Sequence, residues 1–333
     1  LLMIPAIFWA GTAALARRLQ DRVPSAILPI SVAAVWAGAE YFRGEVWFLS
    51  FPWLLVGYSQ WNQETVLQGA SLVGVYGLSA LIVGVNGALA DWLPPLASAG
   101  RRAAGLAWVA AALALLWWGR GEAARWRVEA ETGRTVIVAA IQDESYNDVR
   151  LAAWTRQAAK ADPKPEIVVW PEYSTLLPPG HEAERIAALR TRAREVRAAL
   201  VIGCVSFRGT RPEPVTAGAG LPAVAGVFSR HKKFENFALV LGPDGSELGR
   251  YWKTHPIPIV EAWVARGTEF PVFNLPAVKT GIQICYDLDA EDGARKVVAN
   301  GAELLLVPNL APQYWGPWQH RLHSAMAPLR AVE

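Results

Sequence analysis

The chain has 333 residues, of which 53% are hydrophobic and only 18% are charged. Soluble domains usually carry about 25% charged residues, so this composition argues against a wholly soluble protein. The formal net charge is only +3, and no basic stripe with interleaved aromatic residues is present, which argues against nucleic acid as a partner. Hydrophobic residues dominate positions 1–118, whereas charged residues are common from Arg120 onward. We therefore predict a transmembrane helix bundle over 1–118 and a globular domain over 119–333.

Four apolar segments have the composition of membrane helices, which need about 20 residues to cross a hydrocarbon core. They cover residues 1–16, 24–42, 66–90 and 103–118, and we expect the first to be the end of a longer span. The aromatic segment over 46–58 is shorter and suits an interfacial or re-entrant position. In the third segment Ala80, Gly84 and Ala88 recur every fourth residue, which lets another helix approach closely. We expect at least four membrane segments.

Arginines indicate which side of the membrane each loop occupies. They cluster in the short loops 17–22 and 101–102, which are two spans apart. Loops rich in Lys and Arg face the cytoplasm, so both loops belong on that side. Everything after Arg120 then lies on the extracytoplasmic side.

The globular part alternates strand and helix patterns, which predicts a layered α/β or α+β domain. Helical patterns cover 149–161 and 182–199, and residues 212–226 form a loop rich in Pro, Gly and Ala. The predicted strands are 135–142, 166–170, 200–206, 238–241, 281–286 and 303–307.

The two cysteines differ in their surroundings. Cys285 lies at the end of the predicted strand 281–286, next to acidic Asp287, so it is a candidate nucleophile at a polar rim. The alternative is that it fills space, because free cysteine is among the most buried residue types. Cys204 lies within an apolar strand pattern, and we interpret it as a core residue.

Two further reactive residues follow predicted strands. Glu172 comes directly after the strand 166–170, and Lys253 follows a run leading to His255. A carboxylate can take the thiol proton of Cys285, and a lysine can stabilise an oxyanion while the thiolate attacks an acyl carbon. Taken singly, Glu172 could be a surface carboxylate and Lys253 a lysine that extends its amine to solvent.

Together these motifs resemble the nitrilase (carbon-nitrogen hydrolase) superfamily. The resemblance rests on Trp170-Pro171-Glu172, on Lys253-Thr254-His255 and on Ile284-Cys285-Tyr286-Asp287, in this order. It implies an αββα sandwich, a thioester formed at Cys285, Glu172 as general base and acid, and Lys253 as the group that stabilises the oxyanion.

Further motifs are similar to those of the apolipoprotein N-acyltransferases. They are Phe42-Arg43-Gly44, Phe51-Pro52-Trp53, Gly57-Tyr58-Ser59-Gln60, Gly316-Pro317-Trp318-Gln319-His320 and Leu329-Arg330-Ala331-Val332-Glu333. Glu261 matches a second glutamate of that family. The resemblance implies supporting or substrate-binding roles for Tyr286, Asp287, Asn309 and Trp318. Trp318 can equally be a lipid-entrance residue or an anchor at the membrane surface.

The resemblance implies acyl transfer in two steps. Cys285 would take the sn-1 acyl chain of a phospholipid and pass it to the N-terminal amine of a diacylglyceryl-cysteine in an apolipoprotein. The implied location is the bacterial cytoplasmic (inner) membrane, with several spans, an extracytoplasmic catalytic domain and one more membrane helix after Glu333. We expect a monomer without a cofactor. We also expect no metal site, because His320 and His323 have no third or fourth ligand at a suitable spacing.

Two alternatives to acyl transfer stay open. The short connection between Glu261 and Gly281 resembles soluble nitrilases and amidases, where the acyltransferases usually have a long arm. Asp287 stands where those enzymes usually have Glu, and Leu310 follows Asn309 where they usually have Asp. A membrane-tethered amidase or hydrolase, whose acyl-enzyme is released by water, is therefore the second hypothesis. The third is a membrane scaffold with an inactive nitrilase domain.

Overall fold

The computed structural model describes most of the chain, in two compact units. The described residues are 3–24, 26–46, 50–92, 99–144, 147–207, 234–276 and 278–333. The first unit is Leu1–Arg134 with Pro317–Glu333, and the second is Thr135–Gly316. The predicted loop 212–226 and residues 47–49, near the start of the predicted aromatic segment 46–58, lie outside the described residues.

The first unit is helical. Its apolar segments fold as predicted into helices, because Ala- and Leu-rich stretches favour this conformation. The helices are α1 (Met3–Gln20), α2 (Leu28–Tyr41), α3 (Glu64–Leu67), α4 (Ala70–Asp91), α5 (Ala99–Thr132) and, from the end of the chain, α10 (Gly316–Ser324) and α11 (Met326–Val332). A π-helical turn (Phe42–Val46) and a 3-10 turn (Val56–Gln60) lie between α2 and α3.

Small residues bring α4 and α5 together. A Cβ atom added to Gly84 would lie 2.3 Å from the ring of Trp108, and one added to Gly105 would lie 3.1 Å from the Cβ of Ala88. The predicted close approach of another helix at Gly84 and Ala88 is thereby confirmed. Helix α4 also kinks at Gly74, where φ is 64°.

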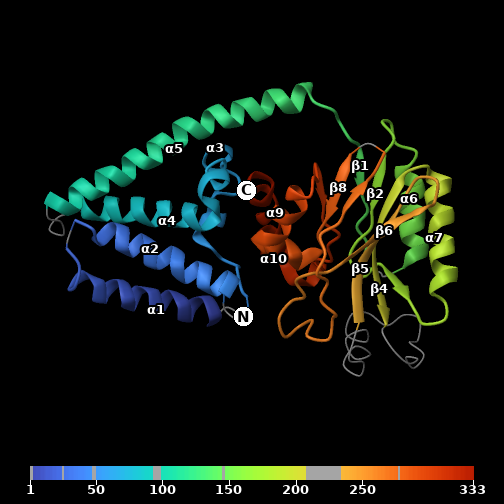
Figure 1. Ribbon diagram of the computed structural model, residues 1–333, viewed down its shortest axis with the longest axis horizontal. Coiled ribbons are helices and arrows are strands. Elements are labelled where there is room, and N and C mark those ends of the chain that lie inside the picture. Colours follow the sequence, from blue (N-terminus) through green and yellow to red (C-terminus); the bar gives the residue numbers. More distant parts are fainter. Residues whose placement is uncertain are drawn as a thin grey trace. The chain divides into compact units, whose positions relative to one another are not determined.

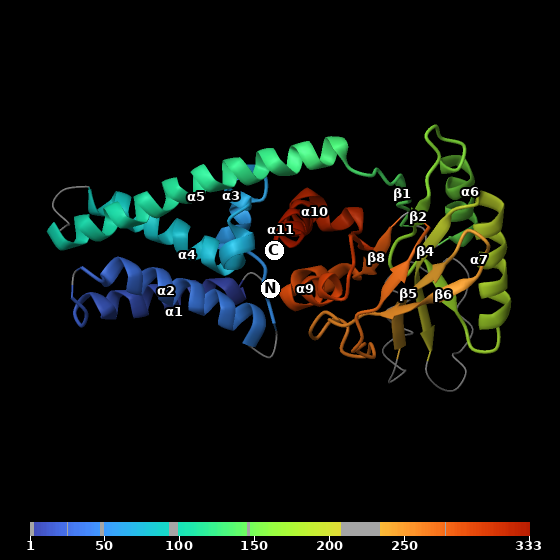
Figure 2. The ribbon, with the colours of Figure 1, turned by 45° about the horizontal axis from the view of Figure 1, so that its top comes forward.

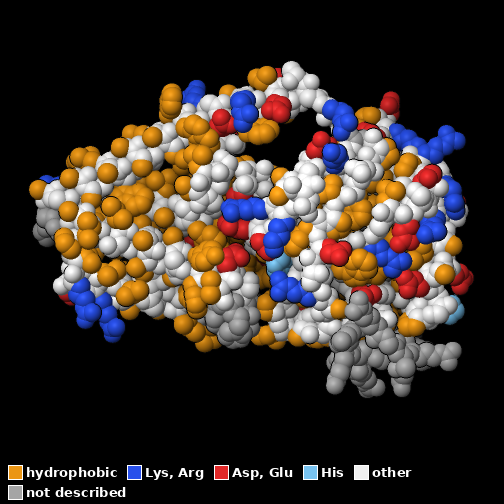
Figure 3. All heavy atoms as spheres, viewed as in Figure 1, with side chains coloured by type: hydrophobic (Ala, Val, Ile, Leu, Met, Phe, Trp, Pro, Cys, Tyr) orange, Lys and Arg blue, Asp and Glu red, His pale blue; other side chains and the backbone are white. Residues whose placement is uncertain are grey.

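Among the described residues, two helices are long and apolar enough to cross a membrane, namely α4 and α5. Only 11% of the apolar window of α5 is buried, so its apolar side chains are exposed rather than packed in a protein core. Figure 3 shows many exposed hydrophobic side chains on the helices of the first unit. Helix α2 has 14 residues, fewer than the roughly 20 that a span needs. The predicted multi-helix membrane bundle is supported for these two helices only.

Helix α5 runs without interruption through the predicted domain boundary at residues 118 and 119. The division into a membrane domain over 1–118 and a catalytic domain over 119–333 stays a prediction, and the compact units have different bounds.

The second unit contains two sheets. The first has the order β1-β2-β4-β5-β6, with β3 also paired to β4; its β1, β2 and β4 are parallel, and β4, β5 and β6 are antiparallel. The second has the order β7-β8-β9. The strands are β1 (Val138–Ala140), β2 (Ile167–Val169), β3 (Thr175–Leu177), β4 (Ala199–Phe207), β5 (Phe234–Leu241), β6 (Glu247–Trp252), β7 (Val272–Asn274), β8 (Lys279–Ile282) and β9 (Leu304–Leu306).

Helices cover the outer face of each sheet. Helices α6 (Asp148–Ala158) and α7 (Glu182–Val196) lie on one side of the first sheet, and β8 with α9 (Glu291–Ala299) lies on the other (Figures 1 and 2). Helix α9 packs on the second sheet, where a Cβ added to Gly281 would lie 2.5 Å from Val297. The order of layers is therefore helix, sheet, sheet, helix, as the predicted αββα sandwich requires.

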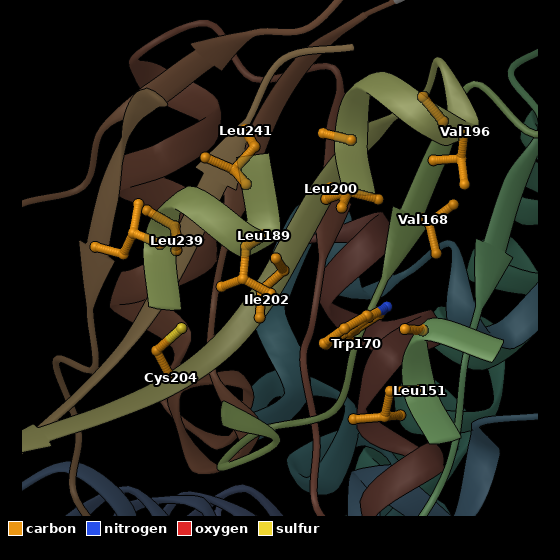
Figure 4. Close-up of a cluster of buried hydrophobic side chains, with 14 of the residues drawn as sticks. Leu151, Val168, Trp170, Leu189, Val196, Leu200, Ile202, Cys204, Leu239 and Leu241 are labelled. Carbon is orange, nitrogen blue, oxygen red and sulfur yellow. The ribbon is translucent and has the colours of Figure 1, made fainter. Parts of the chain in front are cut away.

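Side chains of the first sheet point alternately to its two faces and so contribute to two hydrophobic cores. One face of the first sheet packs against α6 and α7 through Trp170, Leu200, Ile202 and Cys204 (Figure 4). The opposite face packs against the second sheet through the side chains of Ile167, Val169, Val201, Val240, Tyr251, Ile282, Ile284 and Cys285. Cys204 is fully buried, which confirms its prediction as a core residue. Cys285 lies in the core between the sheets, at the rim where the reactive residues gather.

Two predicted elements end earlier than expected. The strand predicted over 281–286 ends as β8 at Ile282, and a 3-10 helix (Cys285–Asp289) follows. The helix predicted over 182–199 ends at Val196, because Arg197 adopts a left-handed conformation with φ 50°. This break lets β4 begin at Ala199.

Candidate active site

Glu172 is carried by the turn that follows β2. Its side chain is only 2% exposed, because the turn packs directly on strand β4. A Cβ atom at Gly203 of β4 would lie 2.1 Å from the carbonyl oxygen of Pro171 and 2.6 Å from the Cα of Glu172. Only glycine permits this approach. The residue after Glu172, Tyr173, has a left-handed backbone with φ 57°.

Lys253 follows β6 and is fully buried. Its ammonium donates to Glu172 Oε1 at 2.8 Å and lies 3.0 Å and 2.8 Å from the two carboxylate oxygens of Glu261. Its backbone is fixed as well, since its N–H donates to the carbonyl of Asn236 and its carbonyl accepts from the N–H of Gly267. Lys253 is thus held between two carboxylates, as the resemblance implies.

Cys285 lies on a turn that exposes its thiol to these charged groups. Its φ is 49°, a left-handed value that is uncommon for a residue with a Cβ atom. Its N–H donates to the carbonyl of Pro308 at 3.0 Å, which continues the pairing of β8 with β9 beyond the end of the strand. Strained backbone of this kind collects at functional sites. The interpretation of Cys285 as a space-filling residue alone does not explain this turn.

Asp287 joins the turn of Cys285 to the segment of Lys253. Its Oδ1 accepts from the N–H and hydroxyl of Thr254 at 3.0 and 3.1 Å and from the N–H of His255 at 2.5 Å. Its Oδ2 accepts from the hydroxyl of Tyr251 and from the N–H of Ile284, both at 2.9 Å. One buried carboxylate therefore sets the distance between the lysine and the thiol.

Burial and charge determine the protonation of the site. Burial raises the pKa of Glu172, the charge of Lys253 lowers it, and the like charge of Glu261 raises it, with a net increase. Burial alone would lower the pKa of Lys253, but the carboxylates of Glu172 and Glu261 raise it well above its ordinary value. Burial and the charge of Glu172 raise the pKa of Cys285, although Lys253 opposes them. The resting thiol is therefore neutral, and it needs a base.

The structure brings most of the predicted residues together. Glu172, Lys253, Glu261 and Cys285 are all buried and electrostatically coupled. Tyr286 is 5% exposed within the turn of Cys285. Asn309 follows Pro308, the residue whose carbonyl accepts from Cys285. Trp318 belongs to the first unit and is 74% exposed, so its role in binding substrate stays a prediction.

Sequence reasoning missed several residues of the site. Asn236 of β5 donates to Glu172 Oε1 at 2.7 Å, and Tyr173 donates to Glu261 Oε1 at 2.5 Å. Tyr251 and Thr254 bind Asp287. Asn236 could have been noticed as a polar residue within an apolar strand, whereas Tyr173 offers no signal beyond its position next to Glu172.

A thiol with a carboxylate base and a lysine close to it is the set of groups that an enzyme needs to form an acyl-cysteine intermediate. The sequence comparisons agree with this class. Residues 99–333 match the carbon-nitrogen hydrolase family, and the chain belongs to that family. Residues 1–88 match the N-terminal domain of apolipoprotein N-acyltransferase, which confirms the resemblance predicted from the motifs.

Curated relatives match across both units. The chain is 27% identical to an apolipoprotein N-acyltransferase of Geobacter metallireducens over 98% of its own length and 64% of the relative. It is 28% identical to the enzyme of the same name from Azotobacter vinelandii, over 91% of this chain and 59% of the relative. The chain thus spans less than two thirds of the length of these relatives. A crystal structure of a carbon-nitrogen hydrolase from Helicobacter pylori is 19% identical, with a TM-score of 0.43 over 58% of this chain and 68% of that chain.

Proposed function

We propose that this chain is a membrane N-acyltransferase that moves an acyl chain from a phospholipid, through a thioester at Cys285, to the N-terminal amine of a diacylated apolipoprotein. The observation that carries the proposal is the ammonium of Lys253 held between Glu172 and Glu261 beside the buried thiol of Cys285. The match of residues 1–88 to an acyltransferase N-terminal domain supports the lipid substrate class.

In the first step the Sγ atom of Cys285 attacks the carbonyl carbon of the sn-1 ester. The thiol proton passes to Glu172, and the ammonium of Lys253 stabilises the negative charge on the carbonyl oxygen. The ester C–O bond then breaks, and the departing lysophospholipid oxygen takes the proton from Glu172. The products of this half-reaction are a lysophospholipid and the acyl-cysteine.

In the second step the free amine of the diacylglyceryl-cysteine attacks the thioester carbon. Glu172 accepts the amine proton, the C–S bond breaks, and the proton returns to the sulfur of Cys285. A thioester suits this step, because it stores the acyl group and yet reacts readily with an amine. Neither step calls for a redox cofactor.

The remaining predicted residues have supporting roles in this proposal. Glu261 fixes the ammonium of Lys253 through both carboxylate oxygens. Asp287 sets the position of Cys285 relative to Lys253. Tyr286, Asn309 and Trp318 are proposed to contact the lipid substrates.

We further propose a multi-pass protein of the bacterial cytoplasmic membrane that acts as a monomer, with the second unit on the extracytoplasmic side. The two apolar helices α4 and α5 support membrane insertion, and the arginine clusters 17–22 and 101–102 support this orientation. A monomer suffices for the chemistry, because Glu172, Lys253 and Cys285 all come from one chain.

The proposal is tested with the purified protein in phospholipid vesicles that carry a labelled sn-1 acyl chain. A synthetic diacylated lipopeptide with a free N-terminal amine is the acceptor. We expect labelled triacylated lipopeptide and lysophospholipid, both absent from Cys285→Ala. Cys204→Ala is the matched control and keeps the activity, because Cys204 is buried in the opposite core. An acyl-enzyme that never reaches the lipopeptide would refute the acceptor.

The second candidate function is a membrane-tethered hydrolase. The segment after Glu261 is short and held close to the site, since the N–H of Ala265 donates to the carbonyl of Phe234 and the N–H of Gly267 donates to the carbonyl of Lys253. In the same vesicle assay, free fatty acid as the only acyl product would favour this candidate. A Cys285 that reacts with no acyl donor or thiol probe, in folded protein, would favour a scaffold.

A further inference from the structure

Asn236 is a fully buried polar residue of strand β5. Side chains of a strand point alternately to its two faces, so Asn236 shares a face with Ala238 and Val240, which belong to the core that contains Cys285. Its Oδ1 atom is buried and has no hydrogen-bond partner among the described residues. A buried acceptor without a partner lowers the stability of a fold. The presence of an amide in this apolar core therefore needs an explanation other than stability.

The contacts of Asn236 suggest such an explanation, because they reach both charged members of the catalytic triad. Its Nδ2 atom donates to Glu172 Oε1 at 2.7 Å, and its backbone carbonyl accepts from the N–H of Lys253 at 2.9 Å. An ionised carboxylate can only accept hydrogen bonds, so the amide has to turn its nitrogen toward Glu172. The unpaired Oδ1 atom is a consequence of this orientation.

Both hydrogen bonds to the carboxylate of Glu172 end at the same oxygen atom. Lys253 donates to Oε1 at 2.8 Å and Asn236 at 2.7 Å, and among the described residues no side chain or backbone group donates to Oε2. The terminal torsion of a glutamate is soft, so one donor alone does not fix how the carboxylate is turned. Two donors, one from β5 and one from the segment after β6, hold Oε1 in place and leave Oε2 available for a proton.

We propose that Asn236 is a positioning residue that holds Oε1 of Glu172, so that Oε2 is the atom that exchanges a proton with Cys285. In the first half-reaction the S–H bond breaks, an O–H bond forms at Oε2, and the sulfur keeps the electron pair with which it attacks the acyl carbon. In the second half-reaction the same oxygen accepts the amine proton and returns it to the sulfur. This inference rests on the proposed function, in which Glu172 is the base for Cys285.

The test measures the rate at which iodoacetamide alkylates Cys285, as a function of pH, in the complete protein with Cys204→Ala. This reaction needs removal of the thiol proton but no phospholipid or lipopeptide, so it is independent of the acyl-transfer assay. The titratable groups that face Glu172 are Lys253, Glu261, Cys285 and Tyr173. Asn236 carries no charge, so an uncharged replacement leaves all of these groups in place.

In the parent protein the rate falls at low pH as Glu172 takes up a proton. Burial raises the pKa of Glu172, and the hydrogen bond from Asn236 is one of the contacts that oppose this rise. In Asn236→Leu we therefore expect the acid limb of the profile to move up by about 1 pH unit. At a pH within the limb the rate then falls about tenfold.

Asn300→Leu is the matched control. It removes an exposed amide that donates to the carbonyl of Phe270 at 2.8 Å, and its acid limb stays in place. A merely structural role of Asn236 would lower the alkylation rate by the same factor at every pH and would overturn the inference.

Two further variants keep the inference open to refutation. Asn236→Ala removes the same donor without adding apolar volume beside Lys253, so the limb should move up even if Asn236→Leu does not fold. In a Glu172→Asp background, whose side chain is one carbon shorter, Asn236→Ala should cause no additional shift, because the hydrogen bond is already broken. An equal shift in that background, or an unmoved limb in folded Asn236→Ala, would refute the role. A shifted limb in a protein that transfers no acyl group to the lipopeptide would support the role and refute only the proposed acceptor.

Discussion

Gly203→Ala is the sharpest test of how β4 supports the catalytic turn. The new Cβ atom would lie 2.1 Å from the carbonyl oxygen of Pro171 and 2.6 Å from the Cα of Glu172, whereas Cβ atoms in proteins essentially never come closer than 3.0 Å to another heavy atom. Both neighbours are backbone atoms, so no side chain can rotate away. The turn must therefore move by about 1 Å, and a misplacement of that size costs about 100-fold in rate.

The assay for Gly203→Ala is the rate of acyl-enzyme formation at Cys285, with thermal unfolding of the same preparation. We expect about 100-fold slower acylation, together with a loss of about 1–3 kcal/mol in stability from overpacking. Gly121→Ala is the matched control. Gly121 is an exposed glycine of α5 with no atom within 4 Å of the added Cβ, so acylation is unchanged. A folded Gly203→Ala protein that acylates at the parent rate would show that the turn of Glu172 does not depend on this contact.

Three further predictions concern the groups around the thiol. In Asp287→Asn the side-chain amide faces the donors that now bind the carboxylate, which come from Thr254, His255, Tyr251 and Ile284. Each buried donor left unpaired costs about 1–3 kcal/mol, so we expect a lower melting temperature and at least a tenfold loss of acylation. Parent-like values of both would contradict the bridging role. Cys204 is fully buried and its pKa is raised to about 12, so mass spectrometry of native protein treated with a thiol reagent should find the label on Cys285 alone; label on Cys204 in folded protein would contradict this. The base Glu172 must be ionised to act, and its pKa is raised above 4.5, so acylation measured between about pH 4 and pH 8 should fall with decreasing pH through a midpoint above 4.5. Glu172→Gln should lose the activity at every pH. A parent midpoint at or below 4.5 would be inconsistent with a buried base.

Local sequence patterns were sufficient to predict most helices and strands and to identify the candidate reactive residues. Apolar segments predicted α1, α2, α4 and α5, because continuous sequence rich in Ala and Leu favours the helical conformation. Alternating patterns predicted most strands of the second unit. Glu172, Lys253 and Cys285 were recognisable, because each lies in a short motif next to a strand.

The positions at which helices and strands end depend on tertiary contacts that cannot be seen in the sequence. The strand leading to Cys285 ends at Ile282, although its apolar pattern continues to Ile284. The reason is Asp287, whose carboxylate binds the N–H of Ile284 and bends the chain into a 3-10 helix. In the same way, the sequence pattern alone did not show that α2 ends after 14 residues, whereas α4 and α5 continue far enough to be candidate spans.

The sequence by itself determined which side chains are candidates for the reaction and in what order they occur, because strand propensity and short motifs are local. Only the tertiary structure decided which side chains surround them. Tyr173 reaches Glu261 across 88 residues of chain, and Asn236 reaches Glu172 across 64. These pairings exist because β2, β5 and β6 belong to one sheet, in which strands far apart in the sequence lie close together. No short stretch of sequence displays them.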